Sequence, residues 1–109
     1  MSLGGIARVV IVGEIGKFGT EVRYSQNGTP IASFMLAVTE LGQDGKTYTT
    51  LIPAEVIGKK AEACSELEAG TPVAFEGRLK TRKKDEAWQL YVQGFELSVL
   101  TLPAAVSAT

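Results

Sequence analysis

Hydrophobic side chains along this chain recur in short runs with the period of a β-strand, and turn residues separate the runs. Between Ile31 and Val38 the side chains alternate between two faces, whereas Ile6–Ile15 is apolar on nearly both faces. Three glycines, Gly13, Gly16 and Gly19, interrupt the first run at three-residue intervals, which is typical of a bulge or a tight bend. The pattern predicts five strands, the first of them broken by these glycines, over residues 6–24, 31–38, 47–57, 73–80 and 88–100.

Turn signals lie between these strands. Asn27-Gly28 is a strong hairpin signal, and Gly42–Lys46 predicts the next turn. The segment Thr81–Ala87 joins the last two strands. Pro53 lies inside the third strand and indicates an edge or a bulge, because proline lacks the N–H that a central strand donates.

One segment, Lys59–Leu67, favours a helix, because alanine and glutamate are good helix formers and Gly70 can end the segment. A lone helix between the third and fourth of five strands predicts an all-β fold, the five-stranded OB-fold Greek-key barrel. A small sandwich and an SH3-like barrel are the alternatives, and neither usually places a lone helix there. We expect one barrel domain over residues 1–102 and a flexible tail over residues 103–109.

Composition excludes several classes of enzyme. The 109 residues are 45% hydrophobic and 21% charged, as in a single globular domain. The chain has no histidine and one cysteine, Cys64, which excludes histidine-based catalysis, nearly all zinc sites and an internal disulfide. We expect Cys64 to be a small buried residue of the helix. Without a signal peptide or a membrane-spanning run, the chain is expected to be soluble and intracellular.

The segment Gly13–Phe18 contains glycines in an arrangement similar to a phosphate-binding loop. Phe18, however, stands where such a loop requires serine or threonine, and the glycine spacing differs. The glycines are better explained as bends of the barrel. We find no catalytic constellation, and we expect a protein that is not an enzyme and needs no cofactor.

The charges are distributed unevenly. Residues 1–77 carry six Lys or Arg and nine Asp or Glu, whereas residues 78–109 carry five and three, and all five of these cations lie within Arg78–Lys84. Strand alternation places four of them on one face at intervals of roughly 6–7 Å, close to the phosphate repeat of an extended single strand: Arg78, Lys80, Arg82 and Lys84. A solvated hairpin tip or a lysine-guarded edge strand would have the same sequence, and the acidic pair Asp85-Glu86 weakens the positive field.

Exposed aromatic rings would add stacking surfaces for bases. Phe34, Phe75 and Phe95 lie in apolar alternation and are predicted to be core residues. Tyr48 and Trp88 flank turns among polar neighbours and are the better stacking candidates, while Tyr24 is ambiguous.

Four strings of the sequence closely resemble the single-stranded-DNA-binding (SSB) proteins of bacteria and organelles: Val9–Gly16, Glu21–Val38, Ile57–Ala61 and Glu76–Lys83. The resemblance extends over roughly residues 6–100. It implies an OB-fold, non-specific binding of single-stranded DNA, and assembly as a dimer or tetramer. It also implies roles in replication, recombination or repair, and a location in the bacterial cytoplasm with the nucleoid or in an organelle.

Basic positions that match the family are Arg23, Lys59, Lys80, Arg82 and Lys83, and Trp88 lies where the family often has an aromatic residue. The sequence departs from the family where stacking aromatics are usual, with Leu41, Leu51, Ile57 and Lys84 in their places. The family's E-W-H-R-V string is Thr50–Ala54 here, and its acidic C-terminal tip is not found in residues 105–109. Binding is therefore expected to be mainly electrostatic and sensitive to salt.

The function hypothesis is binding of single-stranded DNA through Arg78–Lys84, with RNA as a second candidate ligand and replication proteins as candidate partners. Lys46, Lys59 and Arg23 would add charge, and Tyr48 and Trp88 would add stacking surfaces. The alternative is an OB-fold protein-interaction module whose DNA binding is weak or lost, because exposed aliphatic residues suit a protein interface.

Overall fold

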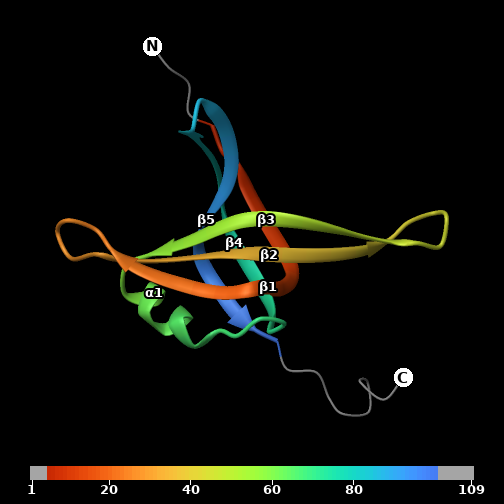
Figure 1. Ribbon diagram of the computed structural model, residues 1–109, viewed down its shortest axis with the longest axis horizontal. Helices are drawn as coiled ribbons and strands as arrows, with labels where there is room; N and C mark the ends of the chain where they lie inside the picture. The colour runs from red at the N-terminus through yellow and green to blue at the C-terminus, as the bar shows by residue number, and fades with distance from the viewer. Residues whose placement is uncertain (1–4, 101–109) are drawn as a thin grey trace.

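A computed structural model describes residues 5–100 and shows a closed five-stranded barrel with the strand order β1-β2-β3-β5-β4 (Figure 1). The helix α1 and the 3-10 turn that follows it lie between β3 and β4, so the predicted OB-fold is confirmed. The proposed tail, residues 103–109, lies outside the described residues. The strands are β1 (Arg8–Tyr24), β2 (Pro30–Leu41), β3 (Thr47–Ile57), β4 (Pro72–Lys84) and β5 (Ala87–Val99), and the helical segments are α1 (Lys59–Ala63) and Cys64–Glu66.

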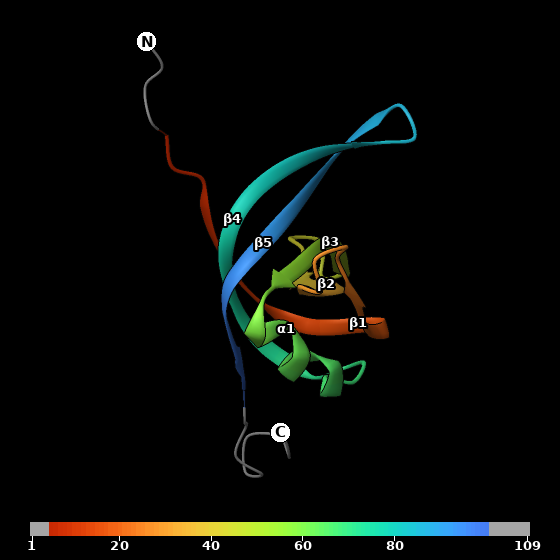
Figure 2. The ribbon, with the colours of Figure 1, turned by 90° about the vertical axis from the view of Figure 1, so that its left-hand side faces the viewer.

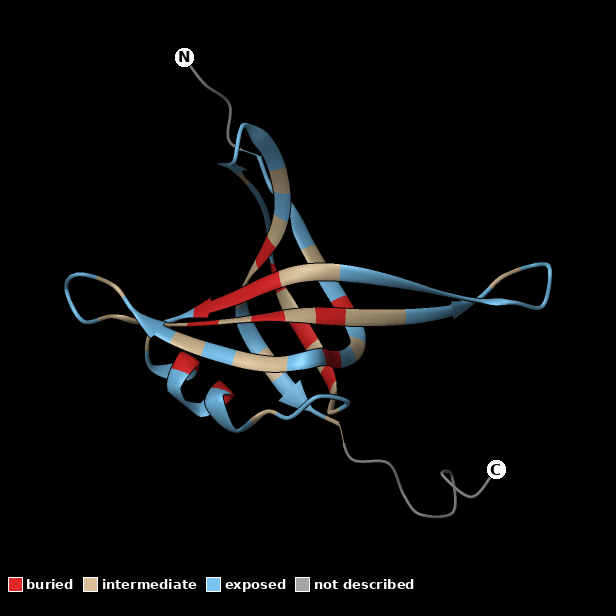
Figure 3. Cartoon of the chain, in the orientation of Figure 1, coloured by how far each residue is buried: buried red, intermediate tan, exposed pale blue. Residues whose placement is uncertain are grey.

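The barrel interior is filled by side chains from alternate strand positions, which appear as separated buried segments along the strands in Figure 3. On β2, for example, Ala32, Phe34 and Leu36 are buried. The ring of Phe34 meets that of Phe75 edge to face, with centroids 5.5 Å apart. Both phenylalanines are therefore core residues, as predicted.

The first strand is one continuous strand with a bulge, rather than two separate pieces. Its first half pairs with β4 up to Glu14, and its second half pairs with β2, with a register shift between Ile15 and Thr20. Gly19 adopts a φ of +68° there, a conformation that glycine adopts without steric penalty. The glycine pattern thus correctly predicted a bulge, and the bulge redirects β1 from one neighbour to the next.

Phe95 is an exception to the predicted core, because 39% of its surface is exposed. The cause is a second bulge, in which Gly77 pairs with Gly94 but Glu76 pairs with Glu96, so that Phe95 is the extra residue. Alternation along β5 shifts by one position at this point, and the Phe95 side chain is turned outward. Gly94 takes the inward position, where a Cβ atom would collide with the ring of Phe75.

Three hairpins project from the barrel. The β1–β2 and β2–β3 turns lie at opposite ends of the long axis (Figure 1), and the β4–β5 hairpin extends away from both (Figure 2). The β4–β5 hairpin is longer than predicted, since β4 continues to Lys84 and closes through a two-residue turn at Asp85-Glu86. The predicted connection over residues 81–87 is therefore mostly strand.

Pro53 lies opposite Met35 in the β2–β3 ladder, and the pairing of β3 with β5 begins one residue later, at Ala54. The proline thus lies where the second edge of β3 is not yet paired with β5, in agreement with the predicted edge position.

Candidate nucleic-acid interface

The basic residues of β4 form a row on the outer face of the β4–β5 hairpin. Leu79 of β4 pairs with the buried Val92 of β5, so Leu79 and every second residue after it lie on the core side of the hairpin. The intervening residues lie on the outer side, as alternation predicts. This outer row consists of Arg78, Lys80, Arg82 and Lys84, opposite Gln93, Tyr91, Gln89 and Ala87 respectively.

Lys83 and Trp88 are cross-strand partners, and they lie on the other face of the same hairpin. Trp88 is 72% exposed, because this end of the hairpin has left the barrel. The hairpin therefore offers a row of cations on one side and an exposed indole beside a lysine on the other.

Arg82 is held in place by three neighbours. Its Nη1 lies 3.3 Å from Oε2 of Glu55, and its Nε donates to Oε1 of Gln89 at 3.1 Å. Its guanidinium lies 4.2 Å from the ring centroid of Tyr91. Because Glu55 is only 6% exposed, Arg82 neutralises a buried carboxylate in addition to facing solvent.

Arg82 and Lys84 line a groove of about 270 Å³ between the β4–β5 hairpin and the outer surface of β1, β2 and β3. Gln89 from the hairpin and residues of β1, β2 and β3 complete it. Those with side chains on the outer face are Phe18, Glu21, Ser33, Met35 and Pro53.

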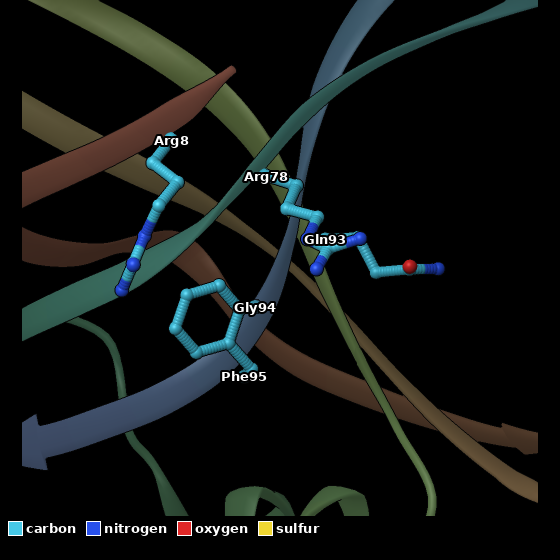
Figure 4. A pocket seen from close by; sticks show the side chains of 5 residues that line it. All are labelled: Arg8, Arg78, Gln93, Gly94 and Phe95. Carbon is cyan, nitrogen blue, oxygen red and sulfur yellow. The ribbon is translucent and has the colours of Figure 1, made fainter. Parts of the chain in front are cut away.

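Arg78 lies in a different cleft, of about 450 Å³, with Arg8, Gln93, Gly94 and Phe95 (Figure 4). Arg8 pairs with Glu76 at 3.1 Å, and its guanidinium lies 5.1 Å from the centroid of the Phe95 ring. Within residues 5–100, no carboxylate lies within ion-pair distance of Arg78. Two arginines that are opposite each other in the ladder make this cleft attractive to an anion.

Lys46 and Tyr48 lie at the tip of the β2–β3 hairpin. The Tyr48 hydroxyl donates to the Asp44 carboxylate, and the Lys46 backbone N–H donates to the same carboxylate at 3.0 Å. These bonds lower the pKa of Asp44, the Tyr48 bond having the larger effect, and the carboxylate in turn raises the pKa of Tyr48. Tyr48 is thus an exposed ring whose hydroxyl is fixed to its own turn.

Arg23 and Lys59 are exposed. Arg23 is near the end of β1 and Lys59 begins α1, and the β1–β2 turn and α1 lie toward the other end of the long axis (Figure 1). Arg23 pairs with Ile31, which pairs with Ile57 on β3, and Lys59 begins α1 two residues later. The ten residues predicted as a binding site are therefore distributed over several parts of the surface, and only the hairpin row brings several of them together.

Sequence reasoning missed Phe18, which is 85% exposed in the β1 bulge. The available signal was an aromatic residue inside a glycine-interrupted segment, where alternation cannot bury it. It also missed Arg8 and Tyr91, whose contacts depend on pairing between distant strands.

Cys64 is buried, as predicted, and its Sγ donates to the Lys60 carbonyl oxygen at 3.2 Å. Burial raises its pKa, which disfavours the reactive thiolate. In the described part of the chain, no three Asp, Glu, Cys or His side chains form a group that could hold a metal ion. No helix among residues 5–100 is long and apolar enough to cross a membrane.

An OB barrel with a row of cations on a projecting hairpin and exposed aromatic rings defines a class of nucleic-acid-binding protein. The model of the single-strand binding protein family matches residues 6–98 of this chain. The chain belongs to that family, whose members are binding proteins rather than enzymes, and the match supports single-stranded DNA as the ligand.

Proposed function

We propose that this protein binds single-stranded DNA without sequence preference and supports replication, recombination or repair in the bacterial nucleoid or an organelle. The observation that carries the proposal is the outer row of the β4–β5 hairpin, where Lys80, Arg82 and Lys84 lie on one face. A row of cations contacts phosphates, which are the same in every sequence, and binding releases the counterions condensed on them.

The other predicted residues extend this interface. Trp88 and Tyr48 offer exposed rings for stacking, and stacking tolerates every base because each base has a π-face. Lys46, Lys59 and Arg23 add charge near the two ends of the long axis, while Lys83 adds charge beside Trp88. A single strand of DNA that contacts all of these residues would have to curve around the barrel.

The test is a titration with a labelled oligo-dT of about 35 nucleotides, followed by fluorescence anisotropy between about 20 and 200 mM salt. The triple variant Lys80→Ala, Lys83→Ala and Lys84→Ala leaves Arg82 in place, because Arg82 also neutralises Glu55. Each lost phosphate contact removes about 0.7 from the slope of log K against log salt, so we expect the slope to flatten by about 2.

The matched control is Lys60→Ala on α1, because the Lys60 amine is already bonded to the Phe95 carbonyl oxygen and paired with the Glu96 carboxylate. This variant is expected to leave the slope unchanged. An unchanged slope in the triple variant would contradict the assignment of the hairpin.

We also propose that the chain assembles as a homo-oligomer, a dimer or a tetramer. Val10 and Val12 on β1 are 69% and 62% exposed, and this part of the strand pairs with β4 but not with β2. An apolar strand with an open edge favours pairing with a second copy. Sedimentation equilibrium measures the mass, and a monomer at micromolar concentration would contradict this part of the proposal.

A second candidate is the protein-interaction module. An apolar groove of about 470 Å³ runs between β1, β3 and the base of the β4–β5 hairpin, lined among others by Val10, Leu51, Leu79 and Leu90. Such a surface fits a hydrophobic partner segment. Absence of oligo-dT binding even at low salt would select this candidate.

A further inference from the structure

Phe18 is a large apolar side chain that the fold leaves exposed. Its 85% exposed ring extends from the β1 bulge, although burying a phenylalanine side chain is favourable by roughly 1.5–3 kcal/mol. Backbone bonds fasten the start of the bulge to the segment before β4: the Ile15 N–H donates to Thr71 at 3.0 Å, and the Gly70 N–H donates to Ile15 at 2.8 Å. The ring is thus presented from an anchored part of the barrel.

Phe18 lines two hollows of different character. One is the groove that contains Arg82 and Lys84. The other is an apolar hollow of about 580 Å³, lined among others by Met35, Ala37 and Leu51. The Lys17 amine lies 5.1 Å from the centroid of the Phe18 ring. An apolar surface for a base thus lies beside cations for a phosphate.

We propose that Phe18 is a base-stacking residue for single-stranded nucleic acid, with the flanking backbone phosphates contacted by Lys84 and Lys17. This inference rests on the proposed function and names a subsite of it. The base would lie on the Phe18 ring, and the strand would continue through the groove toward the outer row of the β4–β5 hairpin. Continuity of the groove with that row favours a nucleic-acid strand over a hydrophobic peptide.

Acidic side chains limit the strength of this subsite. Glu21 lines the groove and Glu14 lines the apolar hollow, while Glu55 neutralises Arg82. Stacking must therefore provide a larger share of the binding here than charge does. It follows that Glu21→Gln should increase affinity, because it removes a carboxylate that repels phosphate and preserves the shape of the groove.

The experiment compares wild type, Phe18→Ala, Phe18→Leu and Phe18→Trp for binding to oligo-dT. Loss of one stacking contact should weaken binding roughly 5- to 150-fold. We expect this loss in both Phe18→Ala and Phe18→Leu, and retention of binding in Phe18→Trp. Because the ring is exposed, the thermal unfolding of all three variants should match that of wild type. Phe18→Trp in a Trp88→Phe background also provides a reporter, whose fluorescence should be quenched by DNA.

An oligonucleotide of the same length with abasic sites distinguishes stacking from other effects, since the penalty of Phe18→Ala should disappear on it. If wild type binds oligo-dT and Phe18→Ala binds equally well, the stacking inference is wrong while the proposed function stands. If wild type does not bind at all, the proposed function itself fails. If Phe18→Ala changes the oligomer mass but not the DNA affinity, Phe18 is a contact between copies and the inference is overturned.

Discussion

At the scale of single residues, Arg82 combines two demands that oppose each other. Its side chain lines the groove, where it is accessible to a phosphate. The guanidinium also pairs with the buried Glu55 and lies over the ring of Tyr91. A charge that already has a carboxylate partner gains less from a phosphate than a free lysine does. Arg82 is therefore better understood as a residue that fixes the hairpin against β3, with Lys80 and Lys84 as the freer cations.

Arg82→Ala should lower the free energy of unfolding by about 1–3 kcal/mol, because it leaves the Glu55 carboxylate buried without its ion pair. Urea denaturation measures the effect. The double variant Glu55→Gln with Arg82→Ala should recover part of the loss, since an unpaired charge is then no longer buried. Lys84→Ala is the control and should change stability by less than about 0.5 kcal/mol. Equal losses in the single and double variants would refute the coupling.

The Asp44–Tyr48 pair makes the β2–β3 turn dependent on pH. The bond requires a charged Asp44 and a protonated Tyr48. Because the pKa of Asp44 is lowered from 3.8, the bond stabilises the folded state fully above pH 3.8. This stabilisation is lost as the pH falls through the lowered pKa. Because the pKa of Tyr48 is raised from 10.0, the bond stabilises the folded state fully below pH 10.0. This stabilisation is lost as the pH rises through the raised pKa.

Asp44→Asn should bring the pKa of Tyr48 back toward 10.0, because an amide does not stabilise the protonated phenol as a carboxylate does. The chemical shifts of the Tyr48 ring carbons, followed through an alkaline titration, report this pKa. Asp85→Asn, in the turn of another hairpin, serves as the control and should leave Tyr48 unaffected. A Tyr48 that titrates identically in Asp44→Asn and wild type would mean that the bond does not persist in solution.

At the scale of elements, the β4–β5 hairpin is closed by a turn of unfavourable chemistry. Asp85 and Glu86 adopt φ angles of +51° and +69°, as a two-residue turn of this kind requires. Such turns favour Asn or Asp at the first position and Gly at the second, so Glu86 is the unfavourable residue. A residue with a Cβ atom in the left-handed region costs roughly 1–2 kcal/mol relative to glycine. The hairpin that carries the basic row therefore contains strain at its tip.

Glu86→Gly should stabilise the protein by about 1 kcal/mol, because it relieves that strain. Glycine loses more backbone entropy on folding than glutamate does, but this cost offsets only part of the gain. Thermal unfolding at high salt, where surface charges are screened, measures this effect. Glu86→Gln removes the same charge while keeping the Cβ atom, so it should give no stabilisation. If Glu86→Gln stabilised the protein equally, charge rather than backbone conformation would be the cause.

At the scale of the whole molecule, the candidate contacts are distributed over a body of 51 × 32 × 28 Å. The β2–β3 turn, which carries Lys46 and Tyr48, lies at one end of the long axis. The β1–β2 turn and α1, near Arg23 and Lys59, lie toward the other end, and the β4–β5 hairpin projects between them (Figures 1 and 2). A short oligonucleotide can reach only one of these regions. Affinity should therefore depend on the length of the strand more strongly than on its sequence.

A series of oligo-dT lengths should show affinity that rises steeply and then levels off within the range of about 4–16 nucleotides per barrel. Anisotropy titrations at one fixed salt concentration provide the measurement, and oligo-dC of the same lengths is the control for sequence. The gain with length should shrink when Lys46→Ala and Lys59→Ala are combined, because these two lysines lie at opposite ends. Affinity that does not change with length would place all binding on a single site.

Much of the fold was predictable because its signals are local. Alternation in β2, the glycines of β1 and the lone helix before β4 each depend on residues that are close in sequence. The outer row of β4 was predictable for the same reason, since a period of two places every second cation on one face. Phe95 was mispredicted because the bulge that turns it outward depends on the register of β5 against β4, which no local pattern encodes.

By itself, the sequence determined the order of the elements and the position of the basic row, because backbone propensity, hydrophobic period and charge belong to neighbouring residues. The family followed from a different signal, the resemblance of four strings of the sequence to the SSB proteins. Only the tertiary structure decided which of those cations are free. Arg82 is paired with a carboxylate 27 positions away, and Lys83 and Trp88 lie on the opposite face from the row. It also decided that Phe18 and Lys84, which are distant along the chain, line the same groove. Such contacts arise from barrel closure, which brings distant strands together through the burial of a shared core.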